Sequence, residues 1–387
     1  MAKVVIFVNV DYYFLSHRLA LARGLRDAGL EVVVVAADTG EGERIRAAGF
    51  RFRAIPLSRS GQSPLGELRT LAAITAAYRE ERPDVVQHAS IKALMYGSWV
   101  ARALRIPVVN VVTGLGYALI DRPDPNLAQR LLRAGVKLGY RFAFRGRGVH
   151  NVFQNPGQLE HFVGLGLCDR ASARLIRGSG VDLERFSAQP LPEGPPIVMC
   201  PARLLWDKGI GELVAAARVV RAAGSDARIV VVGGEDAGNP AQIPRAQVDE
   251  WVAEGVIEWW GHQRDMPAVL AQSSLVVLPS YAEGMPLALA EGGATGRAVI
   301  TTDIPGCREV VIPGETGWLV PVRESASLAA AILDALSDRA RLARMGTASR
   351  AHVAATLSRG QVLREMLALY GEILGTSFPG APAHAAQ

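Results

Sequence analysis

The feature that most constrains the fold is an alternation, repeated in both halves of the chain, of short β-branched runs and longer amphipathic stretches. The strand-like runs cover 4–8, 31–36, 85–88, 108–112, 197–200, 227–232, 275–278 and 298–301. The helix-like stretches include 16–28, 210–222 and 287–295. Strands that are apolar on both sides and separated by helices indicate parallel sheets covered on both faces. The sequence therefore predicts an α/β fold made of doubly wound, Rossmann-like units.

The length of the chain and a proline-rich segment predict two domains. A chain of 387 residues is too long for one core of ordinary size. The segment 189–196 contains four prolines and one glycine, so it continues neither a helix nor a central strand. We expect domains at 1–190 and 191–387, facing a cleft, with ligands at the carboxyl ends of the strands. The helix-like stretch 361–374 follows the second sheet, and the sequence leaves open whether it crosses back onto the first domain.

Three widely separated cysteines, Cys168, Cys200 and Cys307, show neither metal-ligand spacing nor a disulfide framework. We interpret them as small buried hydrophobes in a reducing, cytoplasmic compartment. The apolar start of the chain lacks a basic leader and a cleavage signal, which favours a first strand. No run approaches the ~18–20 apolar residues that a membrane-spanning helix needs.

Charge is distributed unevenly along the chain. Residues 1–190 carry 26 Lys and Arg against 16 Asp and Glu, whereas 191–387 carry 16 against 21. The first half, with a balance of +10, would attract anionic lipid, phosphate or nucleic acid, and the second half, with a balance of −5, would not.

The strongest chemical signal is the segment 280–291, in which seven residues separate Glu283 from Glu291. A strand is followed here by a turn and by a helix that opens near Pro286, a residue suited to a first helical turn. The first N–H groups of this helix would present its positive dipole end to a diphosphate. These groups belong to Gly284, Met285 and Leu287. The two acids would accept hydrogen bonds from sugar and ribose hydroxyls. The alternative is that Glu283 only caps the helix and that Glu291 is a solvated surface residue.

Further polar elements follow other strands of the second half. Arg203 and Lys208 come after its first strand, where two cations would neutralise a leaving diphosphate. Gly233-Gly234 follows its second strand and allows a ligand to approach the backbone closely. His262 follows another short strand, where main-chain groups would hold a nucleobase; an idle loop histidine is the alternative.

These motifs resemble, in order and over almost the whole chain, the family-four retaining glycosyltransferases of GT-B fold. The resemblance implies that Glu283 contacts the donor sugar, Glu291 the ribose, and the segment at His262 the base. It also implies that Arg203 and Lys208 bind the diphosphate and stabilise it as it leaves. The implied reaction retains the configuration of the anomeric carbon and uses no metal or other cofactor.

The first half resembles a narrower group, the bacterial enzymes that extend glycans on polyprenyl diphosphate, through 14–18, 88–92 and 113–117. The resemblance implies a UDP-sugar donor (GDP being the alternative), with an N-acetylhexosamine favoured over a plain hexose, and a polyprenyl-diphosphate glycan as acceptor. The implied acceptor side comprises Asn9, Tyr12, His17, Arg18, His88, Lys92, Thr113 and Gly114. Two departures from the pattern of these relatives limit what the resemblance implies for the acceptor side. The Gly-Gly loop common after the first strand is absent, and Thr113 stands where relatives place a histidine or an acid, so no catalytic base is assigned.

The stretch 126–147 combines basic and apolar residues at helical spacing. Its cations, three or four positions apart, are Arg130, Arg133, Lys137 and Arg141. Such a helix would dock on an anionic membrane, which suits a lipid-linked acceptor and a peripheral position on the inner face of the cell membrane. A surface helix with solvated arginines is the alternative.

Several other functions remain compatible with the sequence. A nucleic-acid-binding protein would suit the basic first half, but the sequence lacks an aromatic platform and zinc spacing, so we expect no nucleic-acid partner. A nucleotide-sugar epimerase shares the architecture, although the order of the Arg203…Lys208 and Glu283…Glu291 motifs fits transferases better. A retaining hexosyltransferase for polysaccharide or other acceptors and a non-catalytic sugar-binding module are the remaining alternatives.

Overall fold

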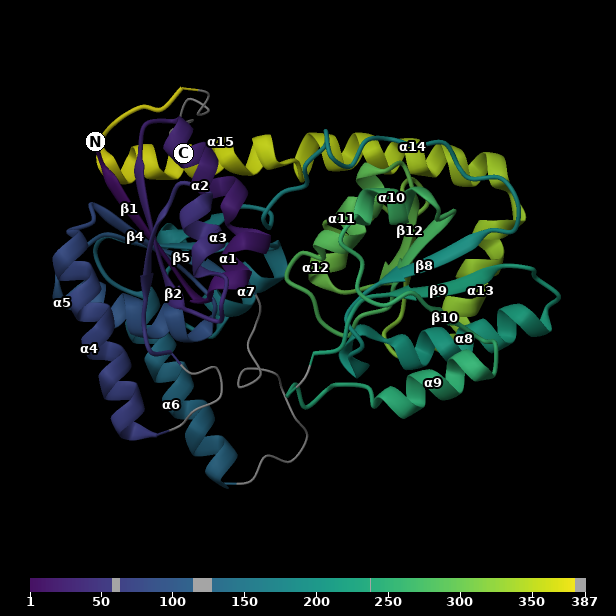
Figure 1. Ribbon diagram of the computed structural model, residues 1–387, viewed down its shortest axis with the longest axis horizontal. Coiled ribbons are helices and arrows are strands. Elements are labelled where there is room, and N and C mark those ends of the chain that lie inside the picture. Colours follow the sequence, from purple (N-terminus) through teal and green to yellow (C-terminus); the bar gives the residue numbers. More distant parts are fainter. Residues whose placement is uncertain (58–62, 114–126, 237, 380–387) are drawn as a thin grey trace. The chain divides into compact units, whose positions relative to one another are not determined.

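The computed structural model describes residues 1–57, 63–113, 127–236 and 238–379 (Figure 1). The chain divides into two compact units. Unit 1 comprises Met1–Ser179 and Val362–Gln387, and unit 2 comprises Gly180–Gln361. Each unit is built on one parallel sheet flanked by helices, which confirms the predicted α/β class.

Within the described residues, the sheet of unit 1 has seven parallel strands in the order β3-β2-β1-β4-β5-β6-β7. They are β1 (Lys3–Val10), β2 (Glu31–Ala37), β3 (Arg51–Ala54), β4 (Val85–Ala89), β5 (Val108–Val112), β6 (Val149–Phe153) and β7 (Ala173–Leu175). The four strands predicted for this half are confirmed. The patterns of β3 and β7 are too short, and polar residues interrupt β6, so none of the three stands out in the sequence.

Helices cover both faces of this sheet. They are α1 (Asp11–His17), α2 (Leu19–Asp27), α3 (Gly42–Ala47), α4 (Pro64–Glu81), η1 (Ala93–Gly97), α5 (Ser98–Ala103), α6 (Leu127–Phe144), α7 (Pro156–Gly164) and the short η3 (Arg170–Ser172). Alternate residues of β1 point to opposite faces: Ile6 packs in the core under α2, whereas Phe7 packs in the core under α4 and α5. The predicted helix at 16–28 is instead broken at Arg18, whose φ of −122° leaves the helical region, and helical structure begins earlier, at Asp11.

The observed boundary between the units lies at Ser179/Gly180, before the proline-rich segment that predicted it at 190/191. Val181 explains the difference, because it forms a parallel bridge with Ser358 and is buried in the core of unit 2. Phe186 is buried in the same core. The last helix, α15 (Arg359–Leu374), contributes buried residues from Val362 to Tyr370 to the core of unit 1.

In the described part of unit 2, six parallel strands form a sheet in the order β10-β9-β8-β11-β12-β13. They are β8 (Ile197–Pro201), β9 (Arg228–Val232), β10 (Glu258–Trp259), β11 (Leu275–Leu278), β12 (Ala298–Thr302) and β13 (Gly317–Val320). The helices are η4 (Trp206–Lys208), α8 (Ile210–Ala222), α9 (Arg245–Ala253), α10 (Met266–Ala271), α11 (Leu287–Ala294), α12 (Pro305–Arg308), α13 (Ser325–Ser337) and α14 (Arg339–Thr356). The strand order reverses between β8 and β11, and doubly wound sheets bind ligands outside the carboxyl ends of their strands at such a point.

The three cysteines lie in the cores as unpaired thiols. Cys168, Cys200 and Cys307 are all buried. Burial raises the pKa of Cys200 to about 12, so this thiol stays protonated and unreactive at neutral pH. This placement agrees with the predicted role as small buried hydrophobes.

Candidate active site

An ion pair between Lys208 and Glu283 stands at the reversal point of the unit 2 sheet. Lys208 ends the short helix η4 after β8, and Glu283 lies in the loop between β11 and α11. Lys208 Nζ donates to Glu283 Oε1 at 2.5 Å, and the two side chains are 20% and 13% exposed. The structure thus brings together two residues, 75 positions apart, that the sequence assigned to the diphosphate and the donor sugar.

Gly209 allows the two loops to meet. Its φ of +71° is unfavourable for other residues, and a Cβ atom there would lie 2.1 Å from the carbonyl oxygen of Pro279. Tyr281 N donates to the carbonyl oxygen of Asp207 at 2.9 Å and joins the same loops. Lys208 and Glu283 are therefore held by main-chain contacts on both sides of the pair.

Gly306 supports the Glu283 loop from α12, a role that no local sequence pattern indicates. A Cβ atom on Gly306 would lie 2.4 Å from the carbonyl oxygen of Glu283 and 2.5 Å from that of Gly284. Thr302 Oγ1 also donates to the carbonyl oxygen of Ser280 at 2.5 Å. Since the contact joins α12 to a loop some twenty residues earlier, only tertiary structure reveals it.

Glu291 lies on α11, half-buried, and no side chain among the described residues donates a hydrogen bond to its carboxylate. Burial raises the pKa of Glu291 to about 7, although the positive charges of Arg185 and Arg359 act in the opposite direction. An acceptor in this state gains most from a ligand that brings hydroxyl donors. The solvated alternative for Glu291 does not fit this environment.

The loop before α11 presents main chain rather than side chains. Pro286 is the N-cap residue, and α11 begins at Leu287. Met285 is buried in the core and Leu287 packs against it, so their side chains are turned away from solvent. Gly284 is held by the close approach of Gly306. The predicted diphosphate contacts at these positions would come from backbone N–H groups.

The Arg203 side chain pairs with the carboxylate of Asp236, a residue that the sequence did not indicate as part of the site. Its Nη1 donates to Asp236 Oδ2 at 2.5 Å, and the arginine side chain is 55% exposed. Asp236 is fixed in turn by Asn239 Nδ2, which donates to it at 2.8 Å. Arg203 therefore lies outside the Lys208–Glu283 pair, and a phosphate would have to share it with Asp236.

The predicted Gly233-Gly234 and His262 elements meet at the carboxyl ends of β9 and β10. A Cβ atom on Gly233 would lie 1.9 Å from the carbonyl oxygen of Ala202, so only glycine allows this loop to pack on the loop that carries Arg203. A Cβ atom on Gly234 would lie 3.5 Å from Cβ of His262, an ordinary van der Waals contact. His262 itself is exposed. These elements surround the loop that follows β8.

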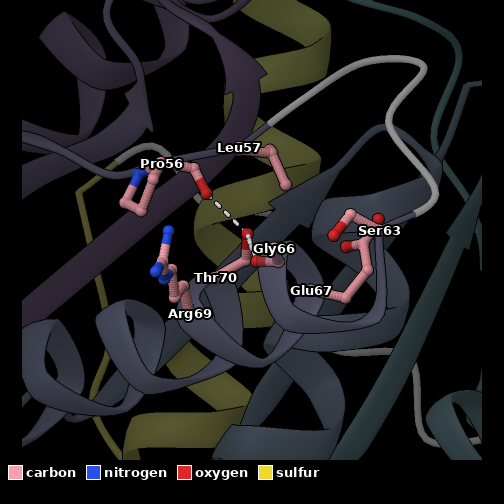
Figure 2. Close-up of a pocket in the computed structure, with 7 residues that line it drawn as sticks. All are labelled: Pro56, Leu57, Ser63, Gly66, Glu67, Arg69 and Thr70. Atoms are coloured by element: carbon pink, nitrogen blue, oxygen red, sulfur yellow. Dashed lines mark hydrogen bonds between the residues drawn. The ribbon is translucent and has the colours of Figure 1, made fainter.

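In unit 1, Asn9 and Lys92 lie at the carboxyl ends of β1 and β4. Asn9 Oδ1 accepts a hydrogen bond from the N–H of Ala93 at 3.2 Å. Lys92 Nζ donates to Glu67 Oε1 at 2.7 Å. Glu67 also lines a pocket of about 390 Å³ between the end of β3 and the start of α4 (Figure 2). Figure 2 shows the hydrogen bond that the Thr70 hydroxyl donates to the carbonyl oxygen of Pro56, which joins two of the residues lining this pocket.

His88 and Arg18 are buried, which corrects their expected placement among residues facing an acceptor. His88 is fully buried, with Nε2 2.8 Å from the Tyr78 hydroxyl and Nδ1 3.0 Å from Asn110 Oδ1. Burial lowers the pKa of His88 to about 4, so the ring is neutral and serves the core. Arg18 is 2% exposed at the break between α1 and α2, and its Nε and Nη2 atoms are buried without partners.

The other predicted acceptor residues are more accessible. Tyr12 is exposed on α1, and the His17 ring packs against Tyr13 with 4.7 Å between ring centroids. Thr113 directly follows β5 and is half-buried. Gly114 lies outside the described residues.

Helix α6 carries the predicted basic stripe. Arg130 and Arg141 are exposed and Lys137 is half-buried, while the side chain of Arg133 is not among those described. Leu138 and Phe142 of the same helix are 70% and 48% exposed. Over the described ranges, no helix has the length and apolar character needed to cross a membrane.

Two known domain families match this chain. Residues 16–176 match the family described as "Glycosyl transferase 4-like domain", and residues 195–338 match "Glycosyl transferases group 1". The N,N'-diacetylbacillosaminyl-diphospho-undecaprenol alpha-1,3-N-acetylgalactosaminyltransferase of Campylobacter jejuni is 26% identical over 348 residues, which are 84% of this chain and 89% of that enzyme.

Solved structures share the fold over nearly the whole chain. HepE from Anabaena, in complex with UDP and glucose, matches with a TM-score of 0.76 and 18% identity, over 96% of this chain and 99% of that chain. Sucrose-phosphate synthase from Thermosynechococcus elongatus matches with a TM-score of 0.79 and 20% identity, over 97% and 100%. At these identities the likeness concerns the two-unit α/β architecture.

Proposed function

The chain belongs to the family-four glycosyltransferases of GT-B fold, and we propose that it transfers N-acetylgalactosamine from UDP-N-acetylgalactosamine to a glycan carried on polyprenyl diphosphate, with retention of configuration. The observation that carries the proposal is the Lys208–Glu283 pair at the reversal point of the unit 2 sheet, with Glu291 on the helix that follows. The choice of donor sugar and of an undecaprenyl-diphosphate-bacillosamine acceptor follows the Campylobacter jejuni relative, whose name specifies both.

On the donor side, Lys208 would bind the departing diphosphate together with N–H groups at the start of α11. The developing negative charge on that diphosphate is the charge an enzyme gains most from stabilising. Glu283 would orient the sugar and offset positive charge at its anomeric carbon, while Glu291 would accept hydrogen bonds from the ribose. The bond to the diphosphate breaks, a bond to the acceptor oxygen forms on the same face, and the acceptor proton passes to the departing diphosphate.

On the acceptor side, Asn9 and Lys92 at the carboxyl ends of β1 and β4 are the residues we assign to the glycan. Lys92 is joined to the pocket through Glu67, a lining residue whose carboxylate accepts a hydrogen bond from it. Tyr12, His17 and Thr113 complete the proposed acceptor surface. The pocket has a volume of about 390 Å³, and the Glu67–Lys92 pair would offer both an acceptor and a donor to sugar hydroxyls.

We further propose that α6 docks the protein peripherally on the inner face of the cell membrane, where a polyprenyl-linked acceptor would be found. Arg130 and Arg141 would meet anionic headgroups, and the exposed Leu138 and Phe142 would enter the interface. Charge reversal at Arg130 and Arg141 should weaken sedimentation with anionic liposomes. Unchanged sedimentation would refute this docking and leave the transferase activity in place.

The decisive experiment is release of nucleotide from a panel of UDP- and GDP-sugars, with and without polyprenyl-diphosphate glycans extracted from membranes. The proposal expects acceptor-dependent release of UDP from UDP-N-acetylgalactosamine, lost in Glu283→Gln. Acceptor-dependent release of nucleotide from another donor would change only the identity of the donor sugar in this proposal. Conversion of a nucleotide sugar in the absence of any acceptor would instead show an epimerase.

A further inference from the structure

A basic pocket lies in unit 1, away from the residues of that unit assigned to the acceptor. It is a pocket of about 540 Å³ bounded by the turns that lead into β5 and β6. Four arginines line it: Arg102, Arg105, Arg145 and Arg147. The remaining lining residues, all described, are 106–108 and 146, 148 and 149, and none of them is acidic.

The arginines of this pocket are poorly neutralised. Only Arg145 has a carboxylate partner among the described residues, Asp169 at 3.1 Å, and its Nε is buried without any partner. Arg102 donates to the carbonyl oxygens of Phe142 and Arg145, both at 3.2 Å, which leaves its positive charge uncompensated. The side chains of Arg105 and Arg147 are exposed, and neither makes a hydrogen bond or ion pair to a described residue.

Arg105 occupies a backbone position that favours glycine. Its φ is +58°, and the N–H groups of Arg105 and Ile106 close the end of α5 on the carbonyl oxygens of Arg102 and Ala101. A branched or long side chain is disfavoured in this left-handed conformation, so arginine is held here against the local backbone preference. Strain of this kind gathers at binding sites.

The pocket is separate from the proposed transferase site. It lies where β5 and β6 begin, whereas Asn9, Lys92 and Thr113 lie where β1, β4 and β5 end. Because the strands of a parallel sheet run in the same direction, their amino ends and their carboxyl ends lie on opposite sides of the unit. A ligand bound among the four arginines would therefore lie away from Asn9, Lys92 and Thr113, the residues of unit 1 proposed to face the acceptor.

We propose that this pocket binds a phosphate group. Guanidinium groups are planar donors matched to phosphate oxygens, and several like charges around one concavity favour an anion of more than one negative charge. The Nε of Arg145, buried without a partner, is an unsatisfied donor on one of the lining arginines. The phosphate belongs either to an anionic lipid headgroup or to a soluble phosphate or diphosphate.

The surroundings of the pocket make the lipid source chemically reasonable. The Arg102 guanidinium lies 4.4 Å from the centre of the Phe142 ring, and Phe142 and Leu138 are both exposed on α6. Apolar side chains beside a phosphate site suit a membrane interface, whereas a soluble anion would have no use for them. The inference does not rest on the proposed transferase activity, because binding is measured without turnover.

The test compares the full-length protein with the double variant Arg105→Gly/Arg147→Gln. Glycine at 105 relieves the backbone conformation, so the variant should melt no lower than the wild type while losing two pocket charges. The control Arg23→Gln/Arg79→Gln removes the same charge from exposed positions on α2 and α4 of the same unit. Binding is measured by sedimentation with phosphatidylglycerol-containing vesicles and by calorimetry with inorganic phosphate and diphosphate.

If the ligand is a headgroup, vesicle binding should weaken about 25-fold in the pocket variant, since each basic residue near an anionic surface contributes about a factor of five. The control should change by less than about threefold, because its charges lie outside the pocket. If the ligand is soluble, diphosphate binding should fall about tenfold in the pocket variant alone, with vesicle binding unchanged. Equal losses in both variants, or no binding to either probe by the wild type, would overturn the proposal.

Discussion

The carboxyl group of Glu291 offers the sharpest test of the donor site, because its protonation links folding to ligand binding. Burial raises its pKa from the usual 4.5 to about 7. Each unit of difference between the folded and unfolded pKa corresponds to about 1.4 kcal/mol, so ionising this group in the folded protein costs up to about 3 kcal/mol. We expect Glu291→Gln, which cannot ionise, to escape that cost.

The sign of the pH dependence follows from the direction of the shift. Between pH 4.5 and 7 the unfolded chain has released the Glu291 proton while the folded protein still holds it. The free energy of unfolding of the wild type therefore falls as pH rises through this window and stays at the lower level above it. Relative to the wild type, Glu291→Gln should gain up to about 3 kcal/mol between pH 4.5 and pH 8.

The assay is urea denaturation of both proteins at several pH values from 4.5 to 8, with the variant difference as the readout. Taking that difference removes contributions from other titrating groups, and its change with pH is independent of any constant effect of the glutamine side chain. A second arm measures binding of a UDP-sugar, whose diphosphate diester does not titrate in this range. Its affinity for the wild type should rise from pH 6 to 8, since hydroxyl donors favour the ionised carboxylate, and should be flat in Glu291→Gln. A variant difference in unfolding energy that does not change with pH would refute the reasoning.

Three further results are expected. Glu283→Gln should lower the rate of acceptor-dependent UDP release by about 100-fold or more with the protein still folded; a rate near that of the wild type would remove Glu283 from the mechanism. Gly306→Ala should lower the same rate by up to about 100-fold, because a Cβ atom 2.4 Å from the carbonyl oxygen of Glu283 must displace its loop, whereas Gly164→Ala meets open space and should be silent. Below pH 6.5 the unfolded chain binds a proton that His88, with its pKa lowered to about 4, does not, so the wild type should lose up to about 3 kcal/mol toward pH 4. Chemical denaturation of His88→Asn should lack that component, and an identical slope in both proteins would contradict it.

Much of the fold follows from the sequence because its central strands are apolar on both faces. β1, β2, β8 and β11 are each buried almost throughout, and runs of β-branched residues mark them directly. β10 pairs through only two residues, Glu258 and Trp259, so its pattern is too short to stand out. The boundary between the units escaped prediction for another reason: the bridge between Val181 and Ser358 joins residues far apart in the sequence.

In the candidate site too, local sequence patterns indicate some residues, whereas contacts between segments far apart in the sequence could not be predicted. Lys208, Glu283 and Glu291 could be proposed from the sequence because the first two follow strands and the third lies on the next helix, positions that the local pattern indicates. Asp236 as the partner of Arg203, and Gly306 as the support of Glu283, depend on contacts between loops. His88 was misplaced because the sequence gives it a strand end, while burial of its ring under α4 is a property of packing.

The division of the chain into a continuous unit 2 and a discontinuous unit 1 has a consequence for synthesis on the ribosome. Residues 180–361 are complete before Val362, Met366, Leu367, Leu369 and Tyr370 emerge. Unit 2 can thus close its whole core before the core of unit 1 that α15 covers is complete, although domains usually fold in order from the amino terminus. Until α15 has been synthesised, the face of the first sheet that it covers remains exposed to solvent and to chaperones. Gln87, whose side chain accepts a hydrogen bond from the Tyr370 hydroxyl, also lacks its partner until then.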